Sequence, residues 1–437
     1  MPRSARRVAL LSTHSSPLAL PGTTKAGGMN VYIRQLTREL AALGYTIDIF
    51  TRQDGVAPLE PVAIAPRVRL IALEAGPPEP LDSAAIQAVT PAFTAALLDY
   101  RRRSAQRYDL IHSHYWISGL TGVELAAAWR RPHLVMFHTL GAVKNRARRG
   151  ESESEARIGA ERAIVASADH FICATPHERD CLVDLYGAAP DSVTVVPGGV
   201  DLDRFRPGDR AAARARLGLG AGPFLLFVGR LEPLKGVDIL LRAAAVADVD
   251  EPLRVLIAGG DERSSEERRR LEALADRLGI GDRVRFDAAV SHEALPDYYR
   301  AADLCVVPSY YESFGLVAVE ALASGTPVVA TAVGGLQYTV RDGQTGYLVP
   351  WRCPEPFAER IETLLANEDL RQRFGEAARR SVTAFQWPGV ARRMSQVYEQ
   401  LLDAREAGSA ASTAMQATER NSSRRAVAAR DGGRQRL

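Results

Sequence analysis

Short apolar segments recur along this chain, most of them separated by a helical pattern, and this alternation constrains the fold more than any other feature. Apolar segments of this kind that alternate with helices predict a parallel sheet with helices on both faces. One helix is expected over Asn30 to Leu43, ended by Gly44. The strands expected in the first half are Val8 to Ser12, Thr46 to Phe50, Leu110-Ile111, Leu134 to Phe137, His170 to Cys173 and Val193 to Val196. Those expected in the second half are Phe224 to Val228, Val255 to Ala258, Val284 to Phe286, Leu304 to Val307, Val328 to Ala330 and Tyr347 to Val349.

The two sets of expected strands, one in each half of the chain, predict two α/β, Rossmann-like, doubly wound domains that face each other across a cleft. A chain of 437 residues is also long enough for two hydrophobic cores. The linker is expected at Pro197 to Gly208, which is rich in Gly, Pro and Asp. The predicted domains are therefore residues 1–200 and 209–386. A last helix, 387–404, is expected to pack back on the first domain, and 405–437 reads as a disordered tail.

Composition excludes several classes of protein. Hydrophobic residues make up 46% and charged residues 24% of the chain, as in ordinary globular proteins. The net charge is +3, and the tail alone contributes about +4, so the rest is not a basic nucleic-acid binder. No apolar run reaches the roughly 20 residues of a membrane span, and the start does not resemble a signal peptide. We expect a cytoplasmic protein without integral membrane association, and leave a homodimer open. The four cysteines lack metal-ligand spacing and read as free thiols: Cys173, Cys181, Cys305 and Cys353.

Two carboxylates stand eight positions apart in the segment that follows the expected strand Leu304 to Val307. Glu312 is expected in a loop and Glu320 about two turns into the next helix. The backbone N–H groups of Phe314, Gly315 and Leu316 would lie free at the helix start, where they and the helix dipole attract phosphate. One element could therefore hold a diphosphate by its backbone and sugar hydroxyls by its acids, which indicates a nucleotide-sugar site.

A second loop follows the expected strand Phe224 to Val228 and contains two cations. Arg230 and Lys235 are five positions apart between glycines, so both can converge on one anion. Arg would clamp two oxygens and Lys would add a point charge. An ordinary solvated basic loop is the alternative. The strand-end position favours phosphate binding.

Polar residues also follow strands of the first half. The loop from Lys25 to Asn30 carries Gly27 and Gly28 at a helix start, where a ligand can approach the backbone. His14 and His138 each follow an expected strand. His138 is expected to orient a substrate or shift a proton, with a structural histidine as the alternative. The sequence His-Ser-His-Tyr-Trp at 112–116 reads as a polar cleft wall.

Other patterns argue against competing kinds of site. The G-x-G-x-x-G fingerprint of dinucleotide-binding enzymes is missing from the glycine loop. Two D-x-D strings, Asp201 to Asp203 and Asp248 to Asp250, could bind a divalent metal. Neither follows an apolar strand into a cleft, so we expect no metal site.

Together these motifs resemble the retaining GT-B glycosyltransferases of family four. The residues concerned are Gly27-Gly28, Gly229-Arg230 with Lys235-Gly236, Glu312 to Gly315 with Glu320, Gly325 to Val329, and Gly334-Gly335. The resemblance implies a UDP-sugar donor and no further cofactor. Arg230 and Lys235 would hold its diphosphate, Glu320 its ribose and Glu312 its sugar. The Gly27-Gly28 loop would border the donor, and His138, Arg230, Lys235 and Glu312 would serve catalysis.

Within this family the chain is similar to the enzymes that glycosylate inositol phosphate. The similarity lies in residues 14–19 and 27–32, in the 112–116 sequence, and in His138 to Leu140 with Val143 to Asn145. The resemblance implies that the acceptor contacts His14, Lys25, Asn30, Tyr115, Thr139 and Arg157. Two positions depart from the pattern: Lys25 stands where an Asp is typical, and Ser83 where a phosphate-binding Lys is typical. Because of these departures the acceptor need not be inositol phosphate itself. We expect a small, inositol phosphate-like hydroxyl compound, phosphorylated or not, and hexose and N-acetylhexosamine donors both remain open.

Transfer with retention is expected, with the cations and the helix start stabilising the departing UDP. Three alternatives stay open at this point. One is an enzyme like sucrose or sucrose-phosphate synthase, and another is a catalytically idle module that binds a nucleotide sugar. The third, a Rossmann oxidoreductase, is disfavoured by the missing fingerprint.

Overall fold

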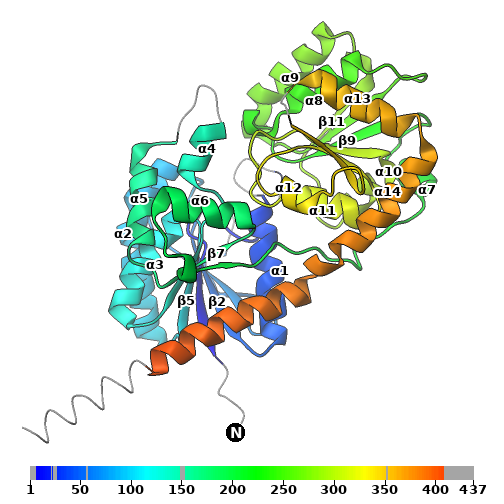
Figure 1. Cartoon of the computed structure of the whole chain (residues 1–437). Helices are drawn as coiled ribbons and strands as arrows, with labels where there is room; N and C mark the ends of the chain where they lie inside the picture. Colours follow the sequence, from blue (N-terminus) through cyan, green and yellow to red (C-terminus); the bar gives the residue numbers. More distant parts are fainter. Residues whose placement is uncertain are drawn as a thin grey trace, which may run out of the picture. The chain divides into compact units, whose positions relative to one another are not determined.

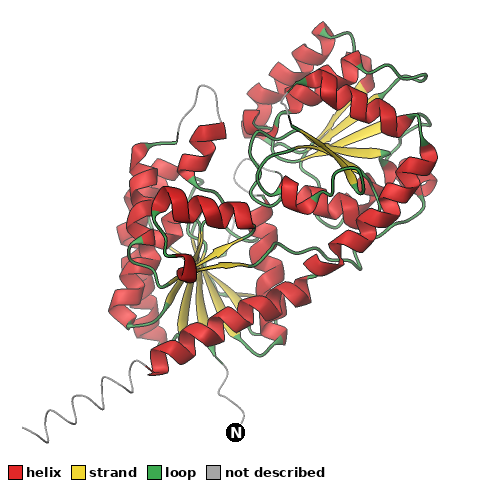
Figure 2. Ribbon diagram, in the orientation of Figure 1, coloured by secondary structure: helices red, strands yellow, loops and turns green. Residues whose placement is uncertain are grey.

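The computed structural model describes residues 6–20, 22, 27–55, 58–147, 153–350 and 353–407. The chain divides into two compact units, residues 1–393 and the residues from Met394 onward, and both sheets belong to the first unit. Helices lie on both faces of each sheet (Figures 1 and 2). The predicted fold class, two doubly wound α/β sheets, is confirmed.

Over the described residues, the first sheet has eight strands in the order β3-β4-β2-β1-β5-β6-β7-β8. They are β1 (Arg7–Leu11), β2 (Thr46–Arg52), β3 (Val62–Ala65), β4 (Val68–Leu73), β5 (Leu110–His114), β6 (His133–Met136), β7 (His170–Cys173) and β8 (Val193–Val195). The accompanying helices are α1 (Gly28–Ala42), α2 (Ser83–Ser104), α3 (Trp116–Trp129), α4 (Gly141–Ala147), α5 (Glu155–Val165) and α6 (Pro176–Tyr186). The strands pair in parallel except for β3, which runs antiparallel to β4 at the edge.

The second sheet has six parallel strands among the described residues, in the order β11-β10-β9-β12-β13-β14. They are β9 (Phe224–Val228), β10 (Arg254–Ala258), β11 (Val284–Asp287), β12 (Leu304–Val307), β13 (Val328–Thr331) and β14 (Gly346–Val349). The accompanying helices are α7 (Arg210–Arg216), α8 (Val237–Val246), α9 (Ser265–Arg277), α10 (Leu295–Ala301), α11 (Leu316–Ala323), α12 (Leu336–Thr339), α13 (Pro354–Leu365) and α14 (Glu368–Ser381). One apolar core joins this sheet to α8, α9 and α13.

The strands expected from the sequence are present, mostly within a residue or two of the predicted ends. Sequence reasoning missed β3 and β4. β4 is almost entirely buried, yet it follows β3 after a two-residue turn rather than after a helix, so the alternation rule did not find it. Prediction also ended β5 too early, because polar residues continue the strand from His112 to His114.

The order of strands reverses once in each sheet. In the first sheet β1 lies between β2 and β5, and in the second β9 lies between β10 and β12. Loops that leave the strands on either side of such a point diverge and leave a crevice, where α/β proteins bind ligands. The loops after β1, β5, β9 and β12 are among those singled out from the sequence.

The connection between the sheets contains one parallel bridge, Val200 to Gln386. Residues 387–407 are helical, and the side chain of Trp387 packs on the ring of Tyr32, with centroids 5.6 Å apart. The tail prediction is wrong for residues 405–407, which continue this helix. The remainder of the predicted tail lies outside the described residues. The division at 1–200 and 209–386 stays a prediction, as does packing of the last helix beyond Arg393.

Candidate functional site

A pocket of about 380 Å³ opens where loops of the two sheets meet. Most residues selected from the sequence line it: His14, Gly27, Gly28, Asn30, Tyr115, His138, Thr139, Arg230, Lys235, Glu312, Phe314, Gly315, Leu316 and Glu320. Arg157 is buried behind the wall rather than lining it. Lys25 lies outside the described residues. The structure thus gathers around one space residues that are up to 306 positions apart in the sequence, such as His14 and Glu320.

The glycine loop of the first half lies against the second half of the chain. A Cβ atom added to Gly28 would come within 3.0 Å of Leu316 Cδ1, and one on Gly27 within 3.7 Å of Arg230 Nε. The buried Asn30 side chain holds this loop, because its Oδ1 accepts from the Gly27 amide and its Nδ2 donates to Ser16 O. Asn30 therefore shapes the pocket wall through the backbone.

The two cations of the β9 loop each meet a carboxylate. Lys235 Nζ donates to Glu312 Oε2 at 2.7 Å, and Arg230 Nη2 lies 2.9 Å from Glu232 Oε1. Glu232 was not identified from the sequence, although it lies between the two cations. This edge of the pocket consequently presents alternating charges, which suit a ligand with both anionic groups and hydroxyls.

Helix α11 begins at Leu316 after Gly315, whose φ of 88° is left-handed and suits glycine. The first backbone amide to donate to the preceding turn is that of Val319, which bonds to Gly315 O. Within the described structure, the amides of residues 314–318 donate to no residue, as expected for a helix N-terminus. Because the helix starts at Leu316, Glu320 lies little more than one turn in, and the prediction of two turns was wrong.

The Glu320 carboxylate is buried and hydrogen-bonded at both oxygens. Oε1 accepts from His292 Nε2 at 2.9 Å, and Oε2 accepts from the Tyr299 hydroxyl at 2.8 Å. Neither partner was identified from the sequence. His292 lies between β11 and α10, so the rule that ligands bind beyond strand ends could have drawn attention to it.

The 112–116 sequence does not form the expected polar wall, because β5 continues through His114 and buries three of its residues. Tyr115 alone of the five lines the pocket. His114 Nδ1 lies 2.8 Å from His138 Nε2, which links the buried strand to the pocket. Both Tyr115 (φ 74°) and His138 (φ 60°) have left-handed backbone conformations, a form of strain that concentrates at functional sites.

Burial controls the charge of these histidines. Burial, with a smaller contribution from the neighbouring His14, lowers the pKa of His138 to about 3. Burial lowers the pKa of His112 to about 3 as well, and that of His114 well below its usual value. His138 is therefore neutral at physiological pH, where it can donate or accept a hydrogen bond but carries no charge.

A network of ion pairs lies behind Tyr115 and Thr139. Arg157 Nε donates to Glu161, its Nη2 donates to both the Oγ1 and the O of Thr139, and its guanidinium lies 5.0 Å above the Tyr115 ring. Glu153 pairs with Arg157 at 3.1 Å and also with Lys144, which itself lines the pocket. Ser83 lines the pocket at the start of α2. Lys144 therefore supplies a cation on the side where Ser83 supplies none.

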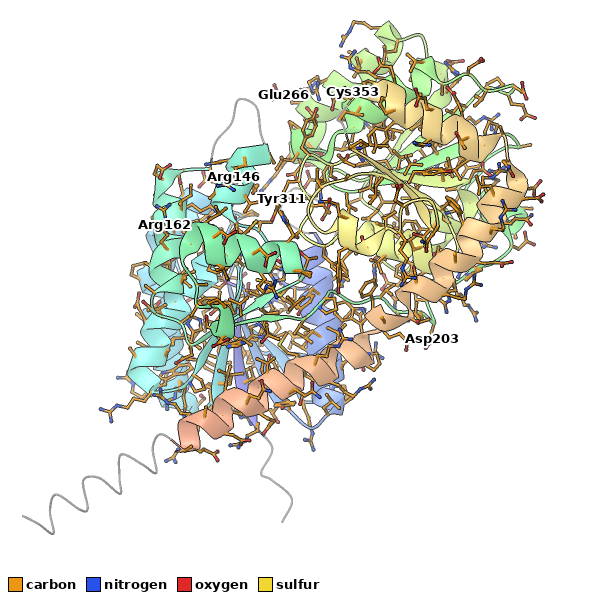
Figure 3. All side chains as sticks on the ribbon, in the orientation of Figure 1. Arg146, Arg162, Asp203, Glu266, Tyr311 and Cys353 are labelled. Atoms are coloured by element: carbon orange, nitrogen blue, oxygen red, sulfur yellow. The ribbon has the colours of Figure 1, made fainter. Side chains whose placement is uncertain are left out.

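Two further polar residues line the pocket without having been predicted. Glu178 is buried, accepts from the Ala174 amide at 2.8 Å, and has its pKa raised to about 7 by burial. Tyr311, labelled in Figure 3, precedes Glu312 in the β12 loop. Burial and the nearby Glu178 raise its pKa well above the usual value.

Among the described residues no three His, Cys, Asp or Glu side chains gather closely enough to hold a metal ion. In the same part of the chain no helix combines the length and apolar character needed to cross a membrane. The four cysteines are free thiols.

Comparison with known proteins agrees with this geometry. Residues 26–204 match the family model of "Glycosyltransferase Family 4", and residues 209–381 match that of "Glycosyl transferases group 1". The two matches meet near the linker. The first match covers the first sheet except β1, and the second covers the second sheet with its surrounding helices.

Individual proteins are similar over most of their length. The D-inositol 3-phosphate glycosyltransferase of Geodermatophilus obscurus is 48% identical over 402 residues, which cover 88% of each chain. A sucrose-phosphate synthase structure from Thermosynechococcus elongatus superposes with a TM-score of 0.85 at 39% identity, covering 91% of this chain and all of that one. HepE from Anabaena, solved with UDP and glucose, shares the fold at 19% identity (TM-score 0.75, 90% and 100% coverage). Since both halves of the site lie in segments that match glycosyltransferase models, and a relative is 48% identical, the chain belongs to family 4 of the GT-B glycosyltransferases.

Proposed function

We propose that this glycosyltransferase moves a hexose or N-acetylhexosamine from a UDP-sugar to an inositol phosphate-like acceptor, with retention at the anomeric carbon. The observation on which this rests is the pocket itself, whose two sides have different chemistry. Glu312, Glu320 and two cations come from the second sheet. The neutral His138 and the aromatic Tyr115 come from the first sheet.

The donor would bind on the side of the second sheet. Arg230, Lys235 and the free amides at the start of α11 are suited to the diphosphate. The carboxylate of Glu320 would accept from ribose hydroxyls, and that of Glu312 from hydroxyls of the transferred sugar. Because Lys235 and Glu312 are already paired, a donor that touches both would keep each charge compensated.

The acceptor would bind on the side of the first sheet, near His14, Tyr115 and Thr139. Its phosphate needs a cation, and Lys144 lines this region. Arg157 supports the same wall through Thr139 and shares Glu153 with Lys144. The departure at Ser83 would thus be offset by Lys144. The Gly27-Gly28 loop, held by Asn30, would lie between donor and acceptor.

The chemistry would proceed on one face of the sugar. The acceptor hydroxyl oxygen forms the new bond to the anomeric carbon as the bond from that carbon to the diphosphate oxygen breaks. The hydroxyl proton passes to the departing diphosphate. Arg230, Lys235 and the α11 amides stabilise the charge that develops there, and His138 orients hydroxyls as a neutral hydrogen-bonding group. The UDP-sugar and the acceptor are the only small molecules that this scheme requires.

A grid of donors and acceptors tests the proposal. UDP-glucose and UDP-N-acetylglucosamine would each be combined with D-inositol 3-phosphate, fructose 6-phosphate, inositol and fructose, and released UDP would be measured. We expect kcat/KM for inositol phosphate to exceed that for inositol by at least about tenfold, because only the phosphate can form a partly buried ion pair with Lys144. NMR of the product would report the anomeric configuration. An inverted product, or no UDP release with any pair, would contradict the proposal.

Fructose 6-phosphate is the second candidate acceptor, and a specific observation favours it. Ser83 departs from the inositol-phosphate pattern, and the superposed sucrose-phosphate synthase is 39% identical. Preference for fructose 6-phosphate over inositol phosphate in the same grid would select it. Replacing Lys144 by Met should weaken both phosphorylated acceptors and leave their unphosphorylated forms unchanged.

A further inference from the structure

The carboxylate of Glu320 is held by a network that extends to the connection between the sheets. His292 contacts Glu320 through Nε2, and Arg204 Nη1 lies 3.0 Å from the other ring nitrogen, Nδ1. Arg204 also pairs with Glu293 at 3.1 Å. Arg204 lies in the connection between the two sheets, next to Asp203, which is labelled in Figure 3.

The hydrogen-bond partners of His292 determine its tautomer. A guanidinium can only donate hydrogen bonds, so Nδ1 of His292 must accept from Arg204. A neutral imidazole that accepts at Nδ1 carries its proton at Nε2. The Nε2–H group therefore donates to Glu320 Oε1, and the ring is held in the only tautomer that can do so.

Packing fixes the ring as well. The side chain of His292 is 4% exposed and that of Glu320 is 7% exposed. Phe205 packs edge-on against His292 with centroids 4.9 Å apart, and it also contacts the Tyr299 ring at 5.8 Å. The two donors to Glu320 thus pack against the same apolar side chain, that of Phe205.

Each oxygen of Glu320 keeps unused acceptor capacity. An ionised carboxylate offers about four acceptor positions, of which His292 and Tyr299 occupy two. Both His292 and Glu320 line the pocket. The remaining positions can accept from two neighbouring hydroxyls, the arrangement that a ribose 2′,3′-diol presents.

We propose that His292 is the positioning residue of the nucleotide site. Held by Arg204, it orients Glu320 toward the ribose diol and so determines how strongly the diol contributes to donor binding. The inference rests on the proposed role of Glu320 in binding ribose. It predicts that loss of His292 weakens binding through the diol specifically.

The test measures binding of UDP and of 2′,3′-dideoxy-UDP to the full chain by titration calorimetry. His292→Ala should bind UDP about tenfold more weakly, as expected when a hydrogen bond to a charged group is lost. The same variant should bind 2′,3′-dideoxy-UDP within about twofold of the parent, because that ligand never uses Glu320. His292→Gln, whose amide can still donate to Glu320, should recover most of the UDP affinity. An equal loss for both nucleotides would overturn the proposal.

Controls separate the possible failures. His170→Asn removes another histidine hydrogen bond, to Thr194 at 2.8 Å, and should leave both affinities unchanged. Arg204→Met, at a side chain that is 27% exposed, should give a smaller loss in the same direction without disturbing the core. If Glu320→Gln does not reduce the preference for UDP over the dideoxy analogue, the proposed ribose role is wrong. If Glu320→Gln reduces this preference and His292→Ala leaves it unchanged, only the positioning role of His292 is wrong.

Discussion

At the scale of single residues, the pocket is organised by charges that already have partners. Lys235 and Glu312 pair at 2.7 Å with side chains that are 20% and 17% exposed. In a partly buried pair of this kind, each charge is neutralised by the other, so neither lies unpaired against the apolar wall of the pocket. Removing one member costs more than its direct contact with a ligand, because the other charge is left unpaired.

Lys235→Ala is therefore expected to lower kcat/KM for the UDP-sugar by about a hundredfold, equivalent to about 3 kcal/mol. The variant loses a cation at the diphosphate and leaves Glu312 unpaired. Steady-state kinetics of UDP release measure this. Arg269→Ala, at an exposed position of α9, is the matched loss of a positive charge and should change kcat/KM less than twofold. A Lys235→Ala enzyme within threefold of the parent would contradict the assignment.

Glu178 offers a prediction about pH. Burial raises the pKa of its carboxyl to about 7, and the Ala174 amide opposes this shift. The folded protein thus holds this proton more tightly than the unfolded chain does. The stabilisation is complete below about pH 4, near the carboxyl pKa of an unfolded chain, and is lost as pH rises through 7.

Glu178→Gln keeps an oxygen for the Ala174 amide but cannot ionise. Relative to the parent, it should gain about 2 kcal/mol of unfolding free energy between pH 5 and pH 8. Urea unfolding at the two pH values measures the difference. Glu155→Gln, at an exposed acid of α5, should change the free energy of unfolding by the same amount at both pH values. A Glu178→Gln effect independent of pH would show that the carboxyl is ionised throughout.

At the scale of elements, the start of α11 depends on one glycine. Gly315 has a φ of 88°, and a Cβ there would lie 2.8 Å from Leu336 Cδ2 and 3.6 Å from Glu312 Cγ. An alanine would be strained by its backbone and would also push on α12. Both effects would turn the amides that follow away from their present direction.

Gly315→Ala is expected to destabilise the protein by about 2 kcal/mol and to weaken UDP binding by about tenfold. Gly343→Ala is the matched control, since Gly343 also has a positive φ (67°) but no atom within 4 Å of an added Cβ. It should lose about 1 kcal/mol of stability and no UDP affinity. Thermal unfolding and calorimetric titration separate the two effects. Equal UDP affinity in both variants would mean that the α11 amides do not contact the ligand.

At the scale of the whole molecule, the buried histidines of the first sheet make the fold sensitive to acid. Burial lowers the pKa values of His112, His133 and His138 to about 3. The unfolded chain binds protons at these sites near pH 6.5, whereas the folded protein does not until about pH 3. Stability from these residues is therefore complete above pH 6.5 and falls as pH drops below it.

Each buried histidine should lower the free energy of unfolding by about 1 kcal/mol for each pH unit below 6.5, and protonation of Glu178 should partly offset this loss. We expect the melting temperature to fall steeply between pH 6.5 and pH 5. Scanning calorimetry across this range measures the slope. His133→Gln removes one titrating group and should make the slope shallower. A melting temperature that stays constant would show that the histidines are protonated in the folded protein.

The order of elements could be predicted from local pattern alone. Apolar segments such as Phe224–Val228 and Leu304–Val307 form buried strands, and their alternation with helices leaves few topologies. Glycine and charge patterns at strand ends located Arg230, Lys235, Glu312 and the Gly27-Gly28 loop. β3 and β4 were missed because a short edge hairpin lacks that alternation.

The sequence by itself determined the fold class and the loops that surround the pocket, since periodicity and strand-end chemistry are local, and its resemblance to known enzymes indicated the glycosyltransferase family. Only the tertiary structure decided which side chains support those loops. His292 and Tyr299 lie 28 and 21 positions from Glu320, and the roles of these two residues and of Glu178 arise from burial and hydrogen-bond geometry. Distances and desolvation depend on packing between elements, which a local pattern does not contain.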